Sequence, residues 1–292
     1  MPQIEEKNRV LGGTLYLVST PIGNLADLSE RAIKVLSEVD FIAAEDTRNS
    51  MRLLSHLEIH KPMVSYHEHN KRERGEQLVE RMLAGESCAL VSDAGTPAVS
   101  DPGEDLVALC AERGVPVTAV PGCCASITAL TLSGLPTGRF CFEGFLPMDK
   151  KERRARLEEL SFETRTMMLH EAPHKLRATL CDLERALGGA RRISLCRELT
   201  KRNEEIFRTT LADAVLHYQE NEPRGEYVLV IEGGEGKRTA SPAEALSLLA
   251  PAEHVAYYEK EGLRRMDAIK QAAKDRGMAK NELYRILCEE NT

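Results

Sequence analysis

From Thr14 to Gly134, short apolar runs alternate with longer segments whose apolar residues recur at helical spacing. The five runs are TLYLVST, FIAAEDT, PMVSYH, CALVSDAG and VPVTAVPG, and a helical segment follows each of them. This alternation is typical of a mostly parallel sheet covered by helices. The runs lack polar alternation because both faces of such a sheet are buried. An N-terminal α/β domain is therefore predicted over residues 12–136, after a tail over residues 1–11.

After residue 136 the pattern changes, and the strand-like runs are FCFEGFL, TMMLHEA, RISLCREL, EEIFRTTL and GEYVLVIEG. Two of these runs follow one another without a helix between them, and such strands pair as antiparallel neighbours. A mixed α/β sheet is therefore predicted over residues 137–236. A Gly/Lys/Ser/Pro-rich link and a small helical, helix-turn-helix-like tail are predicted over residues 237–292.

Composition narrows the class of protein. The chain has 292 residues, a net charge of −7 and eight cysteines, none of them in a CxxC pair. No apolar run is long enough to span a membrane, and the N-terminus lacks the apolar core of a signal peptide. A cytoplasmic protein without a membrane partner is predicted. The negative charge argues against broad, nonspecific nucleic-acid binding but leaves local basic surfaces open.

Small residues gather where three of the predicted strands end. The fourth run leads into Ser92-Asp93-Ala94-Gly95, the first into Thr20-Pro21-Ile22-Gly23-Asn24, and the fifth into Val120-Pro121-Gly122. Ligands of open α/β sheets bind outside the carboxyl ends of the strands. These ends are therefore predicted to form a ligand groove. Dinucleotide and P-loop motifs do not occur in the sequence.

Polar side chains follow the other two N-terminal strands at the same predicted edge. The second run ends in Glu45-Asp46-Thr47-Arg48, and the third leads into His67-Glu68-His69-Asn70. Asp46 and Arg48 either form a structural ion pair or meet a ligand, and both alternatives stay open.

The stretch His170-Glu171-Ala172-Pro173-His174 matches the H-E-x-x-H pattern of zinc proteases. That chemistry needs both histidines one turn apart on a helix. Pro173 disfavours helix at the residue before it, and the preceding TMML is strand-like. We interpret the match as accidental and predict no metal site, while Glu171 and His174 stay candidates for lining a site.

Several motifs occur together and in order: LYLVSTPIGNLADLSERAIKVL, AAEDTR, HEHN, LVSDAGTPAVSDPG, VPG, FEGFLP, RELTK and GEYVLVIEG. In this combination the chain resembles the ribosomal RNA small-subunit methyltransferase I family. That family belongs to the tetrapyrrole-methylase-like, or class III, methyltransferases, which use S-adenosylmethionine. The resemblance covers residues 12–235 and the helical tail. It implies a two-domain α/β fold, a homodimer, and 2′-O-methylation of a cytidine ribose in the decoding region of 16S ribosomal RNA, with the 30S subunit as partner.

The resemblance also implies which residues contact the cofactor. From the N-terminal domain these are Pro21, Ser92, Asp93, Ala94, Gly95, Val99, Ser100, Asp101, Ala125 and Ser126. The second domain would contribute from around Phe145, Leu146 and Glu171. Cys123-Cys124 departs from the proline or small residues that family members commonly carry there, so a slightly reshaped pocket is expected.

Methylation of a ribose hydroxyl benefits from a base, because the hydroxyl is a weak acid. Asp46, Glu68 and Glu171 are the candidates, with His174 beside them, and the sequence does not choose among them. Between Lys260 and Arg285 there are eight Lys/Arg and four Asp/Glu residues, which favours RNA contact by the tail or a role in the dimer. The predicted RNA contacts are Arg48, Asn70, Lys201, Lys270, Lys274, Lys280 and Arg285.

Other functions remain compatible with parts of this pattern. One is methylation of a tetrapyrrole or another small molecule, and another is a non-catalytic RNA-binding assembly factor with an empty cleft. A zinc hydrolase built on the H-E-x-x-H match is a third, remote alternative. Binding of S-adenosylmethionine, methyl transfer to small ribosomal subunits and metal content separate them.

Overall fold

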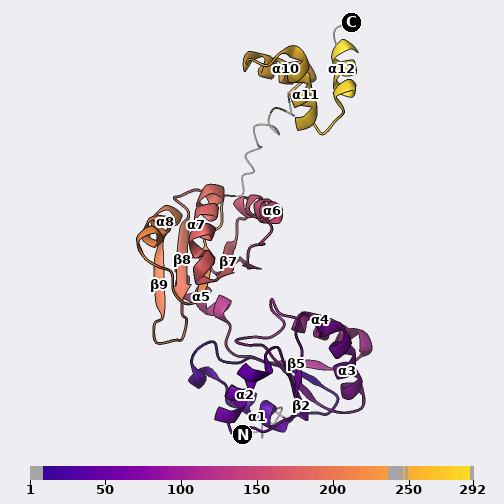
Figure 1. Ribbon diagram of the computed structural model, residues 1–292, viewed down its shortest axis with the longest axis vertical. Coiled ribbons are helices and arrows are strands. Elements are labelled where there is room, and N and C mark those ends of the chain that lie inside the picture. Colours follow the sequence, from indigo (N-terminus) through magenta and orange to yellow (C-terminus); the bar gives the residue numbers. More distant parts are fainter. Residues whose placement is uncertain (1–8, 236–245, 247–248, 290–292) are drawn as a thin grey trace, which may run out of the picture. The chain divides into compact units, whose positions relative to one another are not determined.

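The computed structural model describes residues 9–235, 246 and 249–289 (Figure 1). Contacts divide the chain into two compact units, Met1–Gly234 and Glu235–Thr292. Both predicted sheets lie in the first unit. Residues 1–8 of the predicted tail, and residues 236–245 of the predicted link, lie outside the described residues.

The first sheet has five parallel strands in the order β3-β2-β4-β1-β5, as the alternating pattern predicts. Its strands are β1 (Leu15–Val18), β2 (Phe41–Ala44), β3 (Met63–Ser65), β4 (Cys88–Val91) and β5 (Val117–Val120). The segments between them are the 3-10 turn η1 (Leu25–Asp27) and the helices α1 (Glu30–Glu38), α2 (Thr47–His56), α3 (Lys71–Leu83) and α4 (Gly103–Arg113).

Successive strand residues point to opposite sides of the sheet, so an all-apolar strand gives the sheet two apolar faces. Helices cover both of these faces. On one face, Ile42 and Val91 pack in one cluster with Leu36 of α1. On the other, Phe41 and Leu90 pack in one cluster with Leu78 of α3. Two-sided burial explains why these strands are continuous apolar runs, and it leaves the strand ends as the place for polar and small residues.

The second sheet is mixed, as predicted, with the order β6-β7-β10-β8-β9. Strands β6 and β7 are parallel, whereas the other pairs are antiparallel. Its strands are β6 (Phe140–Gly144), β7 (Thr166–Glu171), β8 (Arg192–Arg197), β9 (Glu205–Thr210) and β10 (Tyr227–Ile231). Its helices are α6 (Lys150–Ser161), α7 (Pro173–Leu187) and α8 (Leu211–Glu220).

The central strand β10 is buried along its whole length. Leu229 and Ile231 join the cluster that α6, α7 and α8 form with the sheet. Val228 and Val230 lie in the cluster on the other face, with Ala129 and Leu130 of α5 (Ala125–Ser133). The last strand among the described residues therefore supplies the centre of the second sheet.

Helix α5 follows β5 in the sequence but packs against the second sheet, where it contacts β7, β8, β9 and β10. Figure 1 shows α5 beside the strands of that sheet. The predicted domain boundary after residue 136 stays a prediction. The packing of α5 argues for a boundary before this helix.

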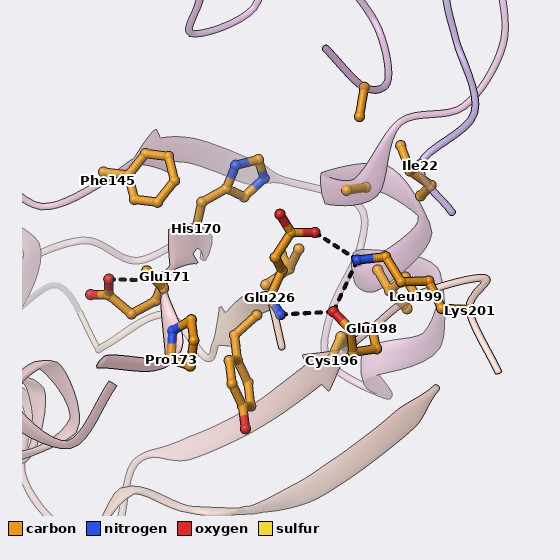
Figure 2. Close-up of a pocket in the computed structure, with 15 residues that line it drawn as sticks. Ile22, Phe145, His170, Glu171, Pro173, Cys196, Glu198, Leu199, Lys201 and Glu226 are labelled. Atoms are coloured by element: carbon orange, nitrogen blue, oxygen red, sulfur yellow. Dashed lines mark hydrogen bonds and ion pairs between the residues drawn. The ribbon is translucent and has the colours of Figure 1, made fainter. Parts of the chain in front are cut away.

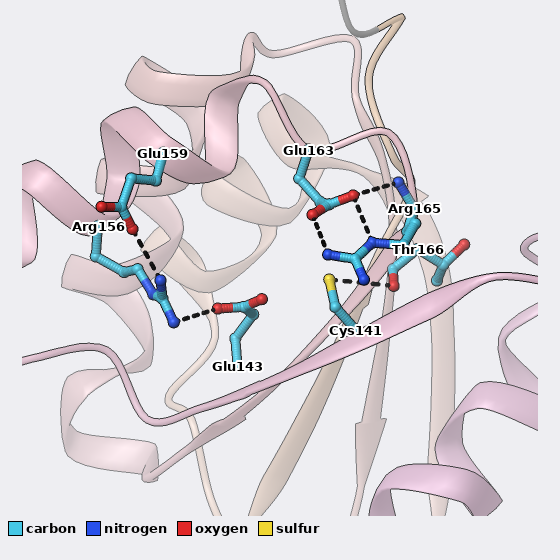
Figure 3. A network of polar contacts seen from close by, with 7 residues as sticks. All are labelled: Cys141, Glu143, Arg156, Glu159, Glu163, Arg165 and Thr166. Carbon is cyan, nitrogen blue, oxygen red and sulfur yellow. Dashed lines mark hydrogen bonds and ion pairs between the residues drawn. The ribbon is translucent and has the colours of Figure 1, made fainter.

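Helix α6 is tied to the neighbouring strand by an ion pair (Figure 3). Arg156 Nη2 lies 2.9 Å from Glu143 Oε2 of β6, and its Nη1 donates to Glu159 Oε2 at 2.8 Å. The Glu143 side chain is largely buried, so the arginine neutralises a carboxylate that would otherwise be costly in this position. Arg156 therefore orients α6 on the sheet.

A second pair in Figure 3 joins Glu163 and Arg165 before β7. The Arg165 guanidinium donates to both Glu163 oxygens, at 2.9 and 2.6 Å, and holds the pKa of this carboxyl at about 2 instead of 4.5. The ionised pair stabilises the fold above the ordinary pKa, and this contribution is lost as pH falls through the folded-state pKa. We expect Glu163→Gln to lower the free energy of unfolding by about 1 kcal/mol at pH 7, because Arg165 is partly solvated.

The expected difference between wild type and Glu163→Gln narrows as the pH falls from 4.5 towards 2 in urea titrations. Glu222→Gln is the matched control, because Glu222 and Arg224 form an exposed pair with the same sequence spacing at 3.1 Å. A Glu163→Gln effect as small as that of the control would show that the pair does not stabilise the fold.

The second unit is helical in its described part, as predicted. It contains α10 (Pro251–Lys260), α11 (Arg265–Asp275) and α12 (Lys280–Glu289). Between α11 and α12 Gly277 has φ +64°, a conformation that glycine adopts readily. A short core with Val255, Ile269 and Leu283 holds the three helices together. None of the described helices of either unit is long and apolar enough to cross a membrane.

Candidate active site

A cavity of about 390 Å³ opens where loops after the first sheet meet the strand ends of the second (Figure 2). Its volume lies in the range of about 300–1,000 Å³ that is usual for small-molecule sites. The lining residues are Ile22, Ala94, Ala125, Phe145, His170, Glu171, Ala172, Pro173, Cys196, Glu198, Leu199, Lys201, Glu226, Tyr227 and Val228.

The loops after β1 and β4 are joined to each other at this cavity. The backbone N–H of Thr20 donates to the carbonyl of Gly95 at 2.9 Å, and the Gly95 N–H donates back at 3.0 Å. Gly95 has φ +83°, and a Cβ there would meet Ile22 Cγ2 at 3.3 Å. Glycine is therefore required for both conformation and space, as the small-residue strand ends predicted.

The loop after β4 contains two strained residues. Ala98 has φ +65° and Ser100 has φ +63°, which are unfavourable for residues with a Cβ. The Asp101 carboxylate stabilises the loop by accepting from the N–H groups of Ala98 at 2.9 Å and Gly103 at 2.8 Å. Helix α4 starts at Gly103, and Asp101 accepts from its first N–H. This carboxylate therefore positions the loop, and Val99 and Ser100 lie exposed beside it.

One wall of the cavity comes from β7 and the segment after β6. His170 lies at hydrogen-bond distance, 3.0 Å, from Ser126 Oγ of α5, and Phe142 and Phe145 contact its ring edge to face. Burial lowers the pKa of His170, so its imidazole is neutral at pH 7. Phe145 is 59% exposed although it lines the cavity, and Leu146 beside it is buried in the core of the second sheet.

The opposite wall contains a triad of charges. Lys201 Nζ lies 2.9 Å from Glu198 Oε1 and 2.8 Å from Glu226 Oε2 (Figure 2). A Cβ on Gly23 would lie only 2.4 Å from Lys201 Cγ, so the loop after β1 packs directly against this wall. Two carboxylates and one ammonium leave a net negative charge, which suits a cationic ligand.

Glu171 lines the cavity, but its carboxylate turns away from it (Figure 2). Oε1 accepts from the Ala172 N–H at 2.8 Å, and Oε2 accepts from the Thr179 hydroxyl at 2.5 Å. β7 ends at Glu171 and α7 begins at Pro173, so His170 and His174 do not share a helix. The geometry required of a zinc-protease motif is therefore not formed here.

The candidate groups after β2 and β3 do not line the cavity. Arg48 donates to both oxygens of Asp46, at 3.1 and 2.8 Å, and this pairing lowers the pKa of Asp46 to about 2. Glu68 is paired with Lys71 at 2.8 Å. The Asn70 amide closes the turn by accepting from the His67 N–H and donating to the Ser65 carbonyl.

Glu45 is a site candidate that the sequence analysis did not select. Burial raises its pKa, and the neighbouring carboxylates of Asp93 and Asp101 raise it further. Asp93 directly precedes Ala94 in the cavity wall. A carboxyl with a raised pKa is a better proton acceptor than Asp46, whose pKa is lowered. The position of Glu45 next to Asp46 in the same motif was the sequence feature that could have identified it as a candidate.

Of the predicted site residues, Ala94, Ala125, Phe145, Glu171 and Lys201 line the cavity, and Ser126 contacts its wall through His170. Pro21, Asp93 and Gly95 flank lining residues, and Ser92 lies two residues before Ala94. The predicted RNA contacts Lys270, Lys274, Lys280 and Arg285 lie on α11 and α12 of the other unit. Sequence reasoning missed His170 as a lining residue in its own right, and also Cys196, Glu226 and Val228.

The model of the tetrapyrrole (corrin/porphyrin) methylase family matches residues 14–215. Ribosomal RNA small subunit methyltransferase I of Halalkalibacterium halodurans is 48% identical, over 95% of this chain and 96% of the relative. The protein of the same description from Bacillus subtilis is 44% identical, over 93% of each chain. The chain belongs to the ribosomal RNA small subunit methyltransferase I family. The family that these motifs suggested in the sequence is thus confirmed.

Solved structures show that this methyltransferase family shares the fold of the tetrapyrrole methylases. Diphthine synthase superposes with a TM-score of 0.57 at 14% identity, over 75% of this chain and 89% of that protein. Cobalt precorrin-4 methyltransferase superposes with a TM-score of 0.55 at 17% identity, over 75% and 95% of the two chains. Uroporphyrin-III C-methyltransferase from Thermus thermophilus, complexed with S-adenyl homocysteine, gives 0.53 at 20% identity, over 75% and 97%. The predicted fold class is confirmed.

Proposed function

We propose that this protein transfers the methyl group of S-adenosylmethionine to the ribose 2′-hydroxyl of a cytidine in 16S ribosomal RNA. The observation that carries this proposal is sequence identity. Ribosomal RNA small subunit methyltransferases I from three bacteria are 43–48% identical to this chain, over at least 93% of its length. When bound, S-adenosylmethionine supplies an electrophilic methyl group on a sulfonium centre.

The cavity suits a cofactor of this kind in size and charge. Ala94 and Ala125 leave room for a ligand, and the net negative charge around Lys201 favours a sulfonium. The buried hydroxyl of Thr20, on the strand end that adjoins Gly95, has no hydrogen-bond partner among the described residues. Pro21, Ser92, Asp93, Gly95 and the loop containing Val99, Ser100 and Asp101 complete the proposed cofactor site.

The chain's own groups would orient the ribose hydroxyl and accept its proton. Orientation of this kind accounts for up to about 7–11 kcal/mol of barrier lowering. Among the carboxyls at the edge of the first sheet we favour Glu45 as base, because its raised pKa leaves it a stronger acceptor than Asp46. Asp46 would instead orient Arg48, whose side chain is 86% exposed and could meet a phosphate while it stays paired with Asp46. Glu68 and Glu171 remain weaker candidates because both carboxylates are already engaged.

The decisive experiment is mass mapping of small-subunit RNA from cells with and without the gene, combined with methyl transfer by purified protein to 30S subunits. We expect one cytidine to lose a ribose methyl group in the deletion strain and the protein to restore it. Methyl transfer to a precorrin-type acceptor, with none to 30S subunits, would overturn the proposal. Failure to bind S-adenosylmethionine in calorimetry would reduce the protein to an assembly factor.

The helical unit after residue 234 is proposed to hold the RNA. Lys270 and Lys274 are both exposed and lie one turn apart on α11. We expect Lys270→Gln with Lys274→Gln to weaken binding to 30S subunits and to flatten its salt dependence, with unchanged affinity for S-adenosylmethionine. Filter binding at several salt concentrations measures the first effect, and calorimetry the second. Unchanged RNA binding would assign these helices to another role, such as the dimer.

A cytoplasmic homodimer is also proposed, on the family resemblance. Sedimentation equilibrium at micromolar concentration tests the dimer directly. A monomer at that concentration would contradict it.

A further inference from the structure

A second large cavity, of about 820 Å³, lies between α6 and α7 of the second sheet. We call it the α6/α7 groove. Its lining residues are Lys150, Arg153, Arg154, Leu157, Glu158, Ser161, Asp182, Arg185 and Ala186. The α6 members recur at helical spacing, so one face of this helix forms a continuous wall along the groove.

The groove is basic in a chain that is acidic. Four lysine or arginine side chains and two carboxylates line it, whereas the whole chain carries a net charge of −7. A polyanion approaching this protein is repelled on average and attracted only where cations are concentrated. The groove is such a place.

The cations of the groove are not equally engaged. Arg153 donates to Asp182 at 2.8 Å and to the Thr179 hydroxyl at 2.9 Å, and Arg185 lies 3.2 Å from the same aspartate. Lys150 and Arg154 are exposed and have no hydrogen bond or ion pair recorded among the described residues. Asp182 is thus engaged by Arg153 and Arg185, whereas Lys150 and Arg154 are available to bind an external anion.

The groove is held in a fixed relation to the cofactor cavity. Pro173, the first residue of α7, lines the cavity, and Asp182 lines the groove nine residues later, about 14 Å along the helix. Thr179 links the two sites, because its hydroxyl bonds Glu171 at the cavity and accepts from Arg153 in the groove. On its other side α6 is fastened to β6 by Arg156 (Figure 3).

We propose that the α6/α7 groove binds the phosphate backbone of the RNA segment next to the nucleotide that is methylated, with Lys150 and Arg154 as the phosphate contacts. This proposal rests on the proposed function, since it requires an RNA substrate. It assigns the fixation of the substrate to the first unit, in addition to the helices after residue 234. Phosphate contacts fix the register of a nucleic acid without reading its sequence, which matches a groove lined by charges and aliphatic side chains.

The test is a double substitution, Lys150→Gln with Arg154→Gln, in the full-length protein. Glutamine retains helix propensity, so α6 is expected to fold. Removal of two phosphate contacts with a single strand reduces the slope of log affinity against log salt concentration by about 1.4, which corresponds to about 25-fold weaker binding of 30S subunits at 0.1 M salt. Affinity for S-adenosylmethionine in calorimetry should not change.

Lys61→Gln with Arg113→Gln is the control for net charge. Both residues precede strands of the first sheet, at the edge opposite the cavity, and the pair changes the charge by the same amount. A salt slope that is unchanged in the groove variant, or reduced equally in the control, overturns the groove assignment. A defect seen with assembled subunits but not with naked RNA would identify a ribosomal protein as occupant and also overturn it. If the wild type methylates 30S subunits, the proposed function stands in all of these cases, whereas no methylation by the wild type means that the function itself has failed.

Discussion

Replacing Ala125 with leucine should weaken S-adenosylmethionine binding by at least about 100-fold, equivalent to about 2.7 kcal/mol. Ala125 begins α5 and lines the proposed cofactor cavity, and its side chain is a single methyl group. A leucine adds three carbons to a cavity of about 390 Å³ that is already bounded by Ile22, Phe145 and Leu199. Isothermal calorimetry measures the affinity, and methyl transfer to 30S subunits should fall in parallel.

Ala125→Ser is the matched control, because serine adds one atom and keeps the position small. We expect its affinity to lie within a few-fold of that of the wild type. Leucine is a good helix former, so α5 should persist in the Ala125→Leu protein and circular dichroism should be unchanged. A folded Ala125→Leu protein that binds S-adenosylmethionine normally would place the cofactor outside this cavity.

The largest loss of stability is expected for Leu229→Ala, at about 3 kcal/mol, within the range for buried leucines. Leu229 is 0% exposed and lies at the middle of β10, opposite Leu169 on β7 and Leu195 on β8. Truncation removes buried apolar surface and leaves a cavity that strands paired on both sides cannot close. Urea unfolding followed by circular dichroism measures the change.

The same substitution at Leu216 provides the control. Leu216 lies on α8 and is 60% exposed, so Leu216→Ala should change the free energy of unfolding by no more than about 0.5 kcal/mol. Equal effects of the two substitutions would mean that β10 does not form the centre of a buried sheet.

Periodicity was sufficient to predict the strands and helices of this protein but not their neighbours in space. The run YVLVI indicated a strand buried on both faces, and β10 is such a strand. Its insertion between β7 and β8 depends on pairing with residues far away in the sequence, which a local pattern does not contain. The sequence did not predict that α5 packs on the second sheet for the same reason, because the apolar residues of a helix do not indicate which sheet they cover.

The candidate site was predicted in part. Where the backbone must approach a ligand closely, small residues appear in the sequence, but the direction in which a side chain points leaves no such signal. Gly95 and Ala94 were found because a close approach of backbone requires small residues. Glu171 was a candidate to offer its carboxylate to the site, but the hydroxyl of Thr179, six residues after the start of α7, donates to this carboxylate instead. His170 was noticed only as part of a false metal motif, although its ring contacts Ser126.

The strand order of the second sheet has a consequence for synthesis of the chain. β7 and β8 are made before β10, yet they do not pair with each other and must wait for residues 227–231 to lie between them. The first sheet, whose strands all precede residue 121, can assemble while translation continues. Tyr227 and Val228 also line the proposed cofactor cavity, so a nascent protein completes this cavity only after the ribosome has released nearly all of the first unit.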